Sequence, residues 1–117
     1  MEPGSRRDEA LLAQLRRGTL QFCVLALLRD EPRYAFDLVR ALGEVEGMVT
    51  SEGTIYPLLS RLRRDGLVRT TWQESPSGPP RRYYELTDAG RRSLDRFVTE
   101  WRSFRDAVDL LTSGGTR

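Results

Sequence analysis

The last long segment of the chain, residues 88–112, carries an unbroken apolar stripe at helical spacing. Its large apolar residues recur at intervals of 3, 4, 3, 4 and 3: Leu94, Phe97, Trp101, Phe104, Val108 and Leu111. Intervals of this kind are the a/d repeat of a helix that packs along a second helix. At 1.5 Å per residue the stripe is about 25 Å long. The pattern therefore predicts one terminal helix with an apolar face that needs a partner.

Four shorter helices are predicted upstream of this segment. The third and fourth each place apolar residues at i, i+3, i+4 and i+7, which defines one buried face. The second is apolar on nearly every side, as is typical of a helix at the centre of a core, and Thr19 is suited to cap its start. Gly66 is expected to end the fourth helix in the left-handed conformation. The expected ranges are 9–17, 20–29, 34–42 and 51–65.

Two β-prone runs, 67–74 and 82–86, lie between the fourth helix and the terminal one. The residues between them, SPSGPP at 75–80, are turn formers. This arrangement predicts a β-hairpin with a long tip. Since neighbouring side chains on a strand point to opposite faces, one of Tyr83 and Tyr84 is expected in the core. Thr87 is expected to cap the terminal helix.

The predicted fold is mainly α with a small β-hairpin. Short helices, a hairpin and a long terminal helix in this order are typical of a winged helix-turn-helix with a C-terminal dimerisation helix. In this fold the third core helix, here 51–65, enters the DNA major groove. The expected organisation is a flexible N-terminus at 1–8, a winged-helix DNA-binding domain at 9–87, the dimerisation helix at 88–112 and a tail at 113–117.

The composition argues against an enzyme. The 117 residues suffice for one domain, and they include no histidine, so the usual acid/base residue and the commonest metal ligand are missing. The single Cys23 lies in an apolar run, where a buried thiol that packs as a small hydrophobe is expected. We therefore expect no catalytic residues, no metal and no cofactor.

The chain carries no predicted membrane segment. Its longest apolar run, Phe22–Leu28, has seven residues, whereas a membrane-spanning helix needs about 20. The chain does not open with a basic and then apolar secretory leader. The sequence therefore predicts a soluble, cytoplasmic protein with no membrane partner.

All nineteen cations are arginines, although the net charge is only +2. Several gather on the predicted recognition helix and beside the hairpin tip, and Arg69 starts the first strand. Arginine offers planar donors suited to phosphates and guanine edges. The expected partner is double-stranded DNA, and the expected contacts are Ser51, Thr54, Tyr56, Arg61, Arg63, Arg64, Arg81 and Arg82.

Different roles are expected within this set. Arg61 is the best candidate to read a base, whereas Arg63 and Arg64 are expected to meet phosphate or solvent. Arg81 and Arg82 are expected at the minor groove or the backbone. Tyr56 either contacts DNA or packs against the hairpin. An alternative function is a protein-interaction module whose arginines meet an acidic partner.

Several segments of the chain form a familiar set. They are LRRGTL (15–20), SEGTIYPLLSRL (51–62), DGLV (65–68), GPPRRYYELT (78–87) and DAGR (88–91), followed by Trp101. In this order they closely resemble the PadR family of bacterial transcriptional regulators, over about residues 15–111. The resemblance implies a dimeric winged-helix regulator, usually a repressor, that binds an inverted-repeat operator, in the subfamily with one terminal helix.

The chain departs from the family pattern at two places. It has Arg33-Tyr34-Ala35-Phe36 where relatives often carry a His-Gly-Tyr type segment, and arginine where the relatives' hairpin often has lysine.

The terminal stripe predicts a homodimer, with leucines of the first helix covering the partner. The expected dimerisation residues are Leu11, Leu12, Leu15, Leu94, Phe97, Trp101, Phe104, Val108 and Leu111. The successive aromatics Phe97, Trp101 and Phe104 are too bulky for an ordinary two-helix seam, so they either fill a widened seam or hold a flat ligand. The resemblance to the family implies that this ligand would be a planar apolar or phenolic small molecule.

Overall fold

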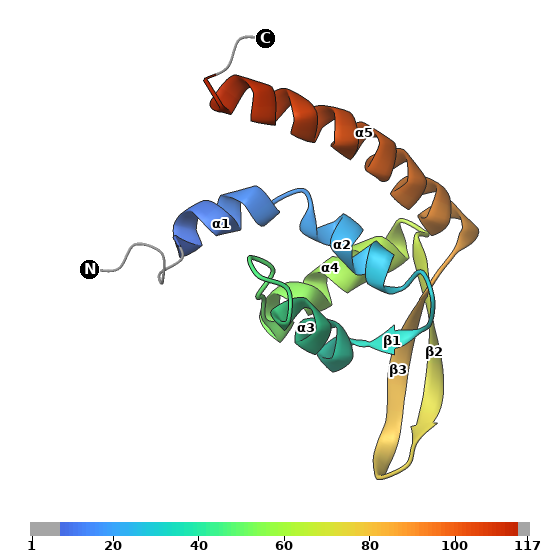
Figure 1. Cartoon of the computed structure of the whole chain (residues 1–117). Helices are drawn as coiled ribbons and strands as arrows, with labels where there is room; N and C mark the ends of the chain where they lie inside the picture. The colour runs from blue at the N-terminus through green and yellow to red at the C-terminus, as the bar shows by residue number, and fades with distance from the viewer. Residues whose placement is uncertain (1–7, 115–117) are drawn as a thin grey trace.

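The computed structural model describes residues 8–114, which form five helices and a three-stranded antiparallel sheet (Figure 1). In chain order the elements are α1 (Glu9–Arg16), α2 (Leu20–Leu27), β1 (Arg33–Tyr34), α3 (Ala35–Gly43), α4 (Glu52–Arg64), β2 (Val68–Ser75), β3 (Gly78–Leu86) and α5 (Asp88–Thr112). The predicted winged-helix class with a long C-terminal helix is confirmed. The expectations for residues 1–7 and 115–117 lie outside the described residues.

The core lies where α2, α3 and α4 meet the base of the sheet. All four apolar positions predicted for the inner face of α4 are buried: Ile55, Leu58, Leu59 and Leu62. They pack with Val24 and Leu25 of α2 and with Leu38 of α3, which are fully buried. As predicted, α2 lies in the core, with Val24, Leu25 and Leu28 buried and its other apolar residues packed against them. Its outer side is only partly buried and faces α5, as the contact between these two helices indicates.

The sheet differs from the predicted hairpin in two ways. A third strand, β1, pairs with β3 through Arg33 and Tyr34, so the sheet order is β1-β3-β2. Two residues are too few for a periodic pattern, which is why the sequence did not reveal this strand. The predicted long tip is also wrong, since β2 continues to Ser75 and pairs there with Gly78.

The two prolines of the hairpin, Pro79 and Pro80, lie within β3 and not in a loop. They lie within the register shift, since Ser75 pairs with Gly78 and Gln73 with Arg81, and they precede the residues of β3 that pair with β1. A strand tolerates proline at a bulge or along an unpaired edge, because no ladder hydrogen bond is lost there. The hairpin therefore extends as a long arm from the body (Figure 1).

The first two helices meet at a tight corner. Asp8, assigned from the sequence to a frayed terminus, caps α1 by accepting a hydrogen bond from the Leu11 N–H at 3.1 Å. Thr19 does not cap α2, contrary to the prediction, because its own backbone is helical (φ −103°, ψ −25°). Its hydroxyl donates instead to the carbonyls of Leu15 and Arg16, both at 3.1 Å, and so closes the end of α1.

The start of α5 is held firmly to the domain. Thr87 caps the helix as predicted, since its Oγ1 accepts from the Gly90 N–H at 3.0 Å and donates to the Gly66 carbonyl at 2.7 Å. Gly66 has φ +79°, the left-handed end predicted for α4. Gly90 is buried so tightly that a Cβ there would collide with the Leu67 carbonyl oxygen.

Beyond its first turns, α5 leaves the body of the protein. Every described residue from Thr99 onward is exposed, and Figure 1 shows the helix projecting past α1. The radius of gyration is 16.7 Å, whereas a compact domain of this length has about 13 Å. Among the described residues, no helix is both long enough and apolar enough to cross a membrane.

Candidate nucleic-acid interface

The outer face of α4 carries the predicted DNA contacts. Ser51, which precedes the helix, and the five predicted residues within it are all exposed: Thr54, Tyr56, Arg61, Arg63 and Arg64. Within residues 8–114, the three arginines of this face form no ion pair with a carboxylate. Their positive charge is therefore available to an external anion such as phosphate.

Arg69 does not contribute in the same way. It lies opposite Glu85 across β2 and β3, and its Nε donates to the Glu85 carboxylate at 3.1 Å. A guanidinium that already has a carboxylate partner adds little net charge to the basic face, the surface that carries Arg61, Arg63 and Arg64. The sequence alone grouped Arg69 with the other basic residues because register, which brings Glu85 opposite, is not visible in it.

A hollow of about 650 Å³, here the corner hollow, lies beside the start of α4. Its polar lining consists of Arg16 and Arg17 at the end of α1, Gln21 of α2, Thr50, Ser51 and Thr54 around the α4 start, and Arg61 in the last turn of α4. The Ser51 side chain does not cap the helix, and its Oγ lies 3.4 Å from the Thr54 Oγ1. Both hydroxyls are exposed and can hydrogen-bond to an anion at the helix start.

Two of the three arginines that line the corner hollow, Arg16 and Arg17, were not among the predicted contacts. Arg16 has a structural role, since it donates to the Gly47 carbonyl at 2.6 Å and pairs with Glu9 at 3.7 Å. Arg17 is exposed and has no ion pair among the described residues, so it joins the basic face. The LRRGTL segment is the signal in the sequence, but its local pattern indicates only the end of a helix and not which surface the arginines join.

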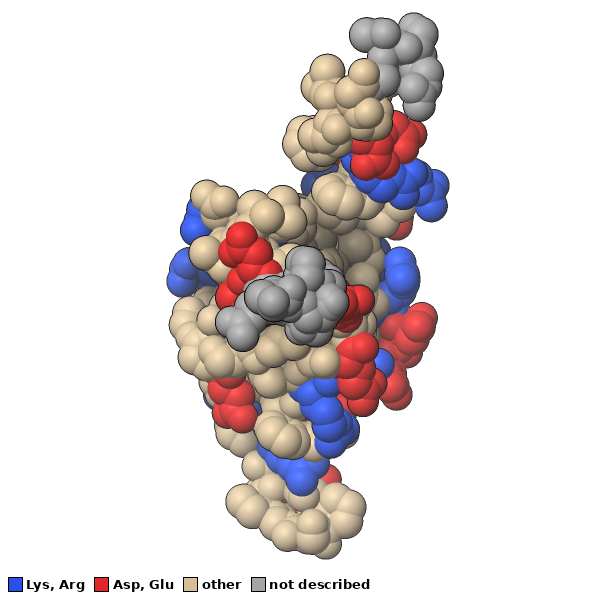
Figure 2. All heavy atoms as spheres, turned by 60° about the vertical axis from the view of Figure 1, so that its left-hand side comes forward, with Lys and Arg blue, Asp and Glu red and all other residues tan. Residues whose placement is uncertain are grey.

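A second hollow of about 460 Å³, here the wing hollow, separates α4 from the hairpin. Its lining is aromatic and basic: Tyr34, Phe36, Tyr56, Trp72, Arg81, Arg82 and Tyr84, with Ser60, Ala35 and Pro80. Tyr56 is half exposed and faces this hollow, which is compatible with either of its two expected roles. In Figure 2 arginines lie just above the hairpin tip, and the tip itself is mostly uncharged.

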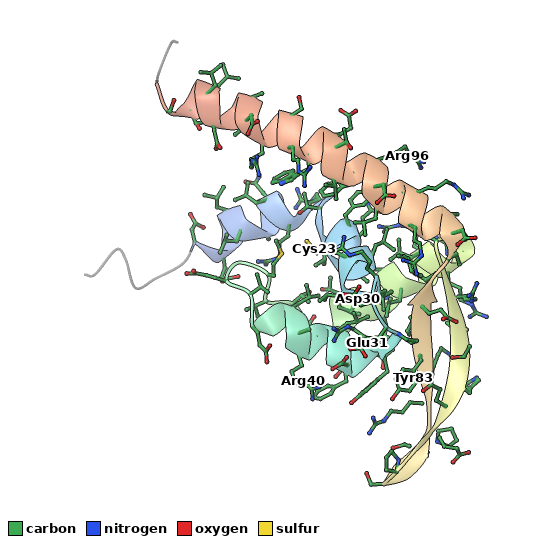
Figure 3. The ribbon with its side chains drawn as sticks, turned by 45° about the vertical axis from the view of Figure 1, so that its right-hand side comes forward. Cys23, Asp30, Glu31, Arg40, Tyr83 and Arg96 are labelled. Carbon is green, nitrogen blue, oxygen red and sulfur yellow. The ribbon has the colours of Figure 1, made fainter. Side chains whose placement is uncertain are left out.

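The tyrosine pair of β3 divides as predicted. Tyr84 is buried and Tyr83 is only partly buried, beside β1 on the side of the hairpin that faces α3 (Figure 3). Burial raises the pKa of the Tyr84 hydroxyl, and Tyr56 adds to the rise, while the charges of Arg82 and Arg63 oppose it. The buried phenol thus lies close to both basic elements.

A third hollow of about 790 Å³, here the seam groove, runs between α1 and α5. The predicted dimerisation and effector residues Leu12, Leu15, Phe97, Trp101, Phe104 and Val108 line it. The Phe97 and Trp101 ring centroids are 5.9 Å apart, and those of Trp101 and Phe104 are 6.4 Å apart. Figure 2 shows the recess between the projecting helix and the body. The groove is mainly apolar and aromatic, with the charged residues Arg16, Arg17, Glu46, Arg105 and Asp109 also in its lining, and it has the size that small ligands occupy.

Burial determines the roles of Leu94 and Cys23, which lie near the seam groove. Leu94, placed by its spacing among the dimerisation residues, is 3% exposed and packs in the chain's own core, so it offers no surface to a partner. Cys23 lines the groove from α2 (Figure 3), and burial raises the pKa of its thiol above the ordinary 9.0. The thiol is therefore protonated near neutral pH and packs as an apolar group. Among the described residues, no cluster could hold a metal ion.

Comparison with known proteins adds a family match. Residues 24–96 match the family model described as the transcriptional regulator PadR-like family. An uncharacterised protein of Lysinibacillus sphaericus is 25% identical over 100 residues, which cover 84% of this chain and 92% of that protein.

Several solved structures have the same fold. A PadR-like transcription factor from Bacteroides fragilis is 39% identical, with a TM-score of 0.71 over 87% of this chain and 98% of that one. A PadR family regulator from Eggerthella lenta is 37% identical, with a TM-score of 0.80 over 91% and 92%. A PadR-like regulator from Bacillus cereus is 34% identical, with a TM-score of 0.79 over 87% and 99%.

Proposed function

The chain belongs to the PadR-like family of transcriptional regulators, and from this premise we propose that it is a homodimeric, ligand-responsive repressor of an inverted-repeat operator. Its relatives are DNA-binding regulators and not enzymes. The single observation that carries the proposal is the exposed face of α4, whose arginines lack carboxylate partners within residues 8–114.

In this proposal α4 enters the major groove and the hairpin lies along the adjacent backbone or minor groove. Arg61, the arginine of α4 that lies nearest the helix start, reads a base edge, while Arg63 and Arg64 neutralise phosphates. Ser51 and Thr54, with Arg17, hold a phosphate at the corner hollow, and Arg81 and Arg82 act from the hairpin. Residues 9–87 are then the DNA-binding domain and 88–112 the dimerisation helix.

Dimerisation is supported by the apolar surface that α5 exposes. Phe104 is 63% exposed and Leu111 is 79% exposed, although both lie on the apolar stripe. Monomeric proteins rarely leave a continuous apolar surface of this kind in water. A second copy would cover it by laying its own α5 and the leucines Leu11 and Leu15 of α1 along the stripe.

Ligand response is supported by the shape and lining of the seam groove. A flat apolar or phenolic molecule between the two terminal helices, in contact with Trp101 and Phe104, would change the separation of those helices. Because the start of α5 is fixed to the domain by Thr87 and Gly90, the spacing of the two recognition helices would change as well. Operator half-sites lie about 34 Å apart, so a dimer held at another spacing loses one of them. Loss of operator occupancy on ligand binding is the behaviour of a repressor that is released by its effector.

The test is selection of DNA from the protein's own genome followed by salt titration. Fragments bound by the purified protein are sequenced, and a duplex with the recovered inverted repeat is titrated at several salt concentrations. The logarithm of the association constant should fall by about 0.9 per neutralised phosphate for each unit of log salt. The variant with Arg61, Arg81 and Arg82 replaced by alanine should lose most of the affinity and part of this slope.

The matched control replaces Arg29, Arg92 and Arg96 with alanine, which removes the same charge from outside the proposed interface. Arg96 points away from the body on α5 (Figure 3). Equal binding by both triple variants would reject the proposed face. A shallow salt dependence, or capture of an acidic protein in place of DNA, would favour the protein-interaction alternative.

A further inference from the structure

The segment in which this chain departs from the family pattern places an aromatic ring beneath a wing arginine. Tyr34 forms half of β1 and pairs with Tyr83 of β3. Its ring meets the Tyr83 ring edge to face, with centroids 5.4 Å apart and planes 65° from parallel. The guanidinium carbon of Arg81 lies 4.3 Å from the Tyr34 ring centroid. Tyr34 is therefore held by a neighbour and in turn supports Arg81.

The second wing arginine has a platform of its own. Trp72 of β2 lies directly opposite Arg82 of β3, and the Arg82 guanidinium carbon is 5.0 Å from the Trp72 ring centroid. Trp72 is 64% exposed although it is the largest apolar side chain of the hairpin. An indole in water contributes little to the core, so a role toward Arg82 accounts for its position.

Stacking leaves the hydrogen-bonding edge of a guanidinium free. A cation over an aromatic face is attracted to the ring without using its N–H groups. Within residues 8–114, Arg81 and Arg82 form no ion pair, although the Arg82 side chain also hydrogen-bonds to the Tyr84 hydroxyl. Both side chains are partly buried beside the wing hollow, so their reach is restricted before any DNA arrives.

We propose that Tyr34 and Trp72 are positioning residues that hold Arg81 and Arg82 in the orientation in which the wing binds DNA. The proposal rests on the proposed function, because it assumes that these arginines contact DNA. A free arginine loses rotamer freedom when it binds, whereas a stacked one has already lost much of it. The aromatic rings thus increase operator affinity without touching the DNA themselves.

The experiment is a double-mutant cycle on the selected operator duplex. Trp72→Leu should weaken binding by about twofold to tenfold per wing, the cost of ordering one free arginine. Trp72→Phe, which keeps a ring, should bind nearly as well as the wild type. In an Arg82→Ala background Trp72→Leu should have no further effect, since there is no guanidinium left to hold. Tyr34→Leu, Tyr34→Phe and Arg81→Ala form the matching cycle for the other wing arginine.

Salt dependence separates positioning from charge. Arg82→Ala should lower the salt slope by about one per wing, whereas Trp72→Leu should weaken binding at an unchanged slope. Thermal unfolding of each variant, followed by circular dichroism, reports whether the fold is kept. Because Trp72 is exposed, the Trp72 variants should unfold at nearly the same temperature as the wild type.

Each outcome decides the matter. Wild-type affinity in Trp72→Leu, or an equal loss in Trp72→Phe, would overturn the positioning role. An additive loss in the Arg82→Ala background would also overturn it, because Trp72 would then contact DNA directly. Arg81→Ala and Arg82→Ala could leave operator affinity unchanged while Arg61→Ala weakens it. The hairpin would then make no contact with DNA, which would refute the positioning role but not DNA recognition by α4.

Discussion

The Phe22 ring of α2 lies flat against the Phe97 ring of α5, with centroids 4.2 Å apart and planes 6° from parallel. Phe97 in turn stacks on Trp101, so an aromatic series leads from α2 to the projecting part of α5. Stacked rings of this kind contribute about 0.5–1.5 kcal/mol beyond their buried area. The stacked rings therefore connect α5 at Trp101 with α2, which packs in the same core as α4.

Arg61→Ala should weaken operator binding by about 1–3 kcal/mol and relax sequence preference, because an arginine that reads a base edge is lost. Arg69→Ala is the matched control, since Arg69 is already paired with Glu85. Fluorescence anisotropy with operator and mutated duplexes measures both effects. Equal losses in the two variants would argue against a base-reading role for Arg61.

Trp101→Glu should convert a dimer into a monomer, because it places a charge in the middle of the apolar stripe. Light scattering at micromolar concentration should give about twice 13.4 kDa for the wild type and 13.4 kDa for the variant. The control is Arg96→Glu, which changes a charge on the outer side of α5, and this variant should remain a dimer. A wild-type mass near 13.4 kDa would refute the dimer.

A planar aromatic ligand should quench or shift Trp101 emission and weaken operator affinity by about 1–3 kcal/mol, the usual range of coupling between sites. The assay uses a Trp72→Phe background, which leaves Trp101 as the one tryptophan and keeps a ring beneath Arg82. Phe104→Ala should reduce ligand binding, since Phe104 lines the same groove. If a panel of planar aromatics changes neither emission nor affinity, the aromatics are packing residues only.

Gly90→Ala should lower the free energy of unfolding by about 1–3 kcal/mol, because the added methyl group collides with backbone at Leu67. Gly43→Ala is the control: Gly43 ends α3, and a Cβ there meets nothing within 4 Å. It should be neutral or stabilising by up to about 1 kcal/mol. Urea unfolding of both variants measures the difference, and similar values for the two would contradict the close packing at α5.

Stability should fall at alkaline pH. Burial raises the pKa of the Cys23 thiol and of the Tyr84 hydroxyl above their ordinary values of 9.0 and 10.0. Both groups are neutral below those values, so their contribution is fully present there and is lost as pH rises through the raised pKa values. Urea unfolding across this range should show the decline, and Cys23→Ala should make it smaller. A pH-independent free energy of unfolding would contradict the burial of both groups.

The helices and the terminal stripe could be predicted because their signals are local. Apolar spacing determined the inner face of α4 and the length of α5, and Thr87 and Gly66 marked where helices begin and end, since caps depend on a few neighbouring residues. The candidate DNA contacts on α4 followed from the same periodicity, because the residues left outside the apolar face include the arginines.

Only the tertiary structure decided which of these residues are exposed and unpaired, and so able to contact a partner. Strand register pairs Arg69 with Glu85, and a strand of two residues brings Tyr34 beneath Arg81. Leu94 has the same spacing as its stripe neighbours, yet the fixed start of α5 directs it into the core while Phe104 remains exposed. Pairing, register and burial depend on segments distant in the chain, whereas periodicity depends on neighbours. The sequence therefore determined the elements and their faces, and the fold determined what each face meets.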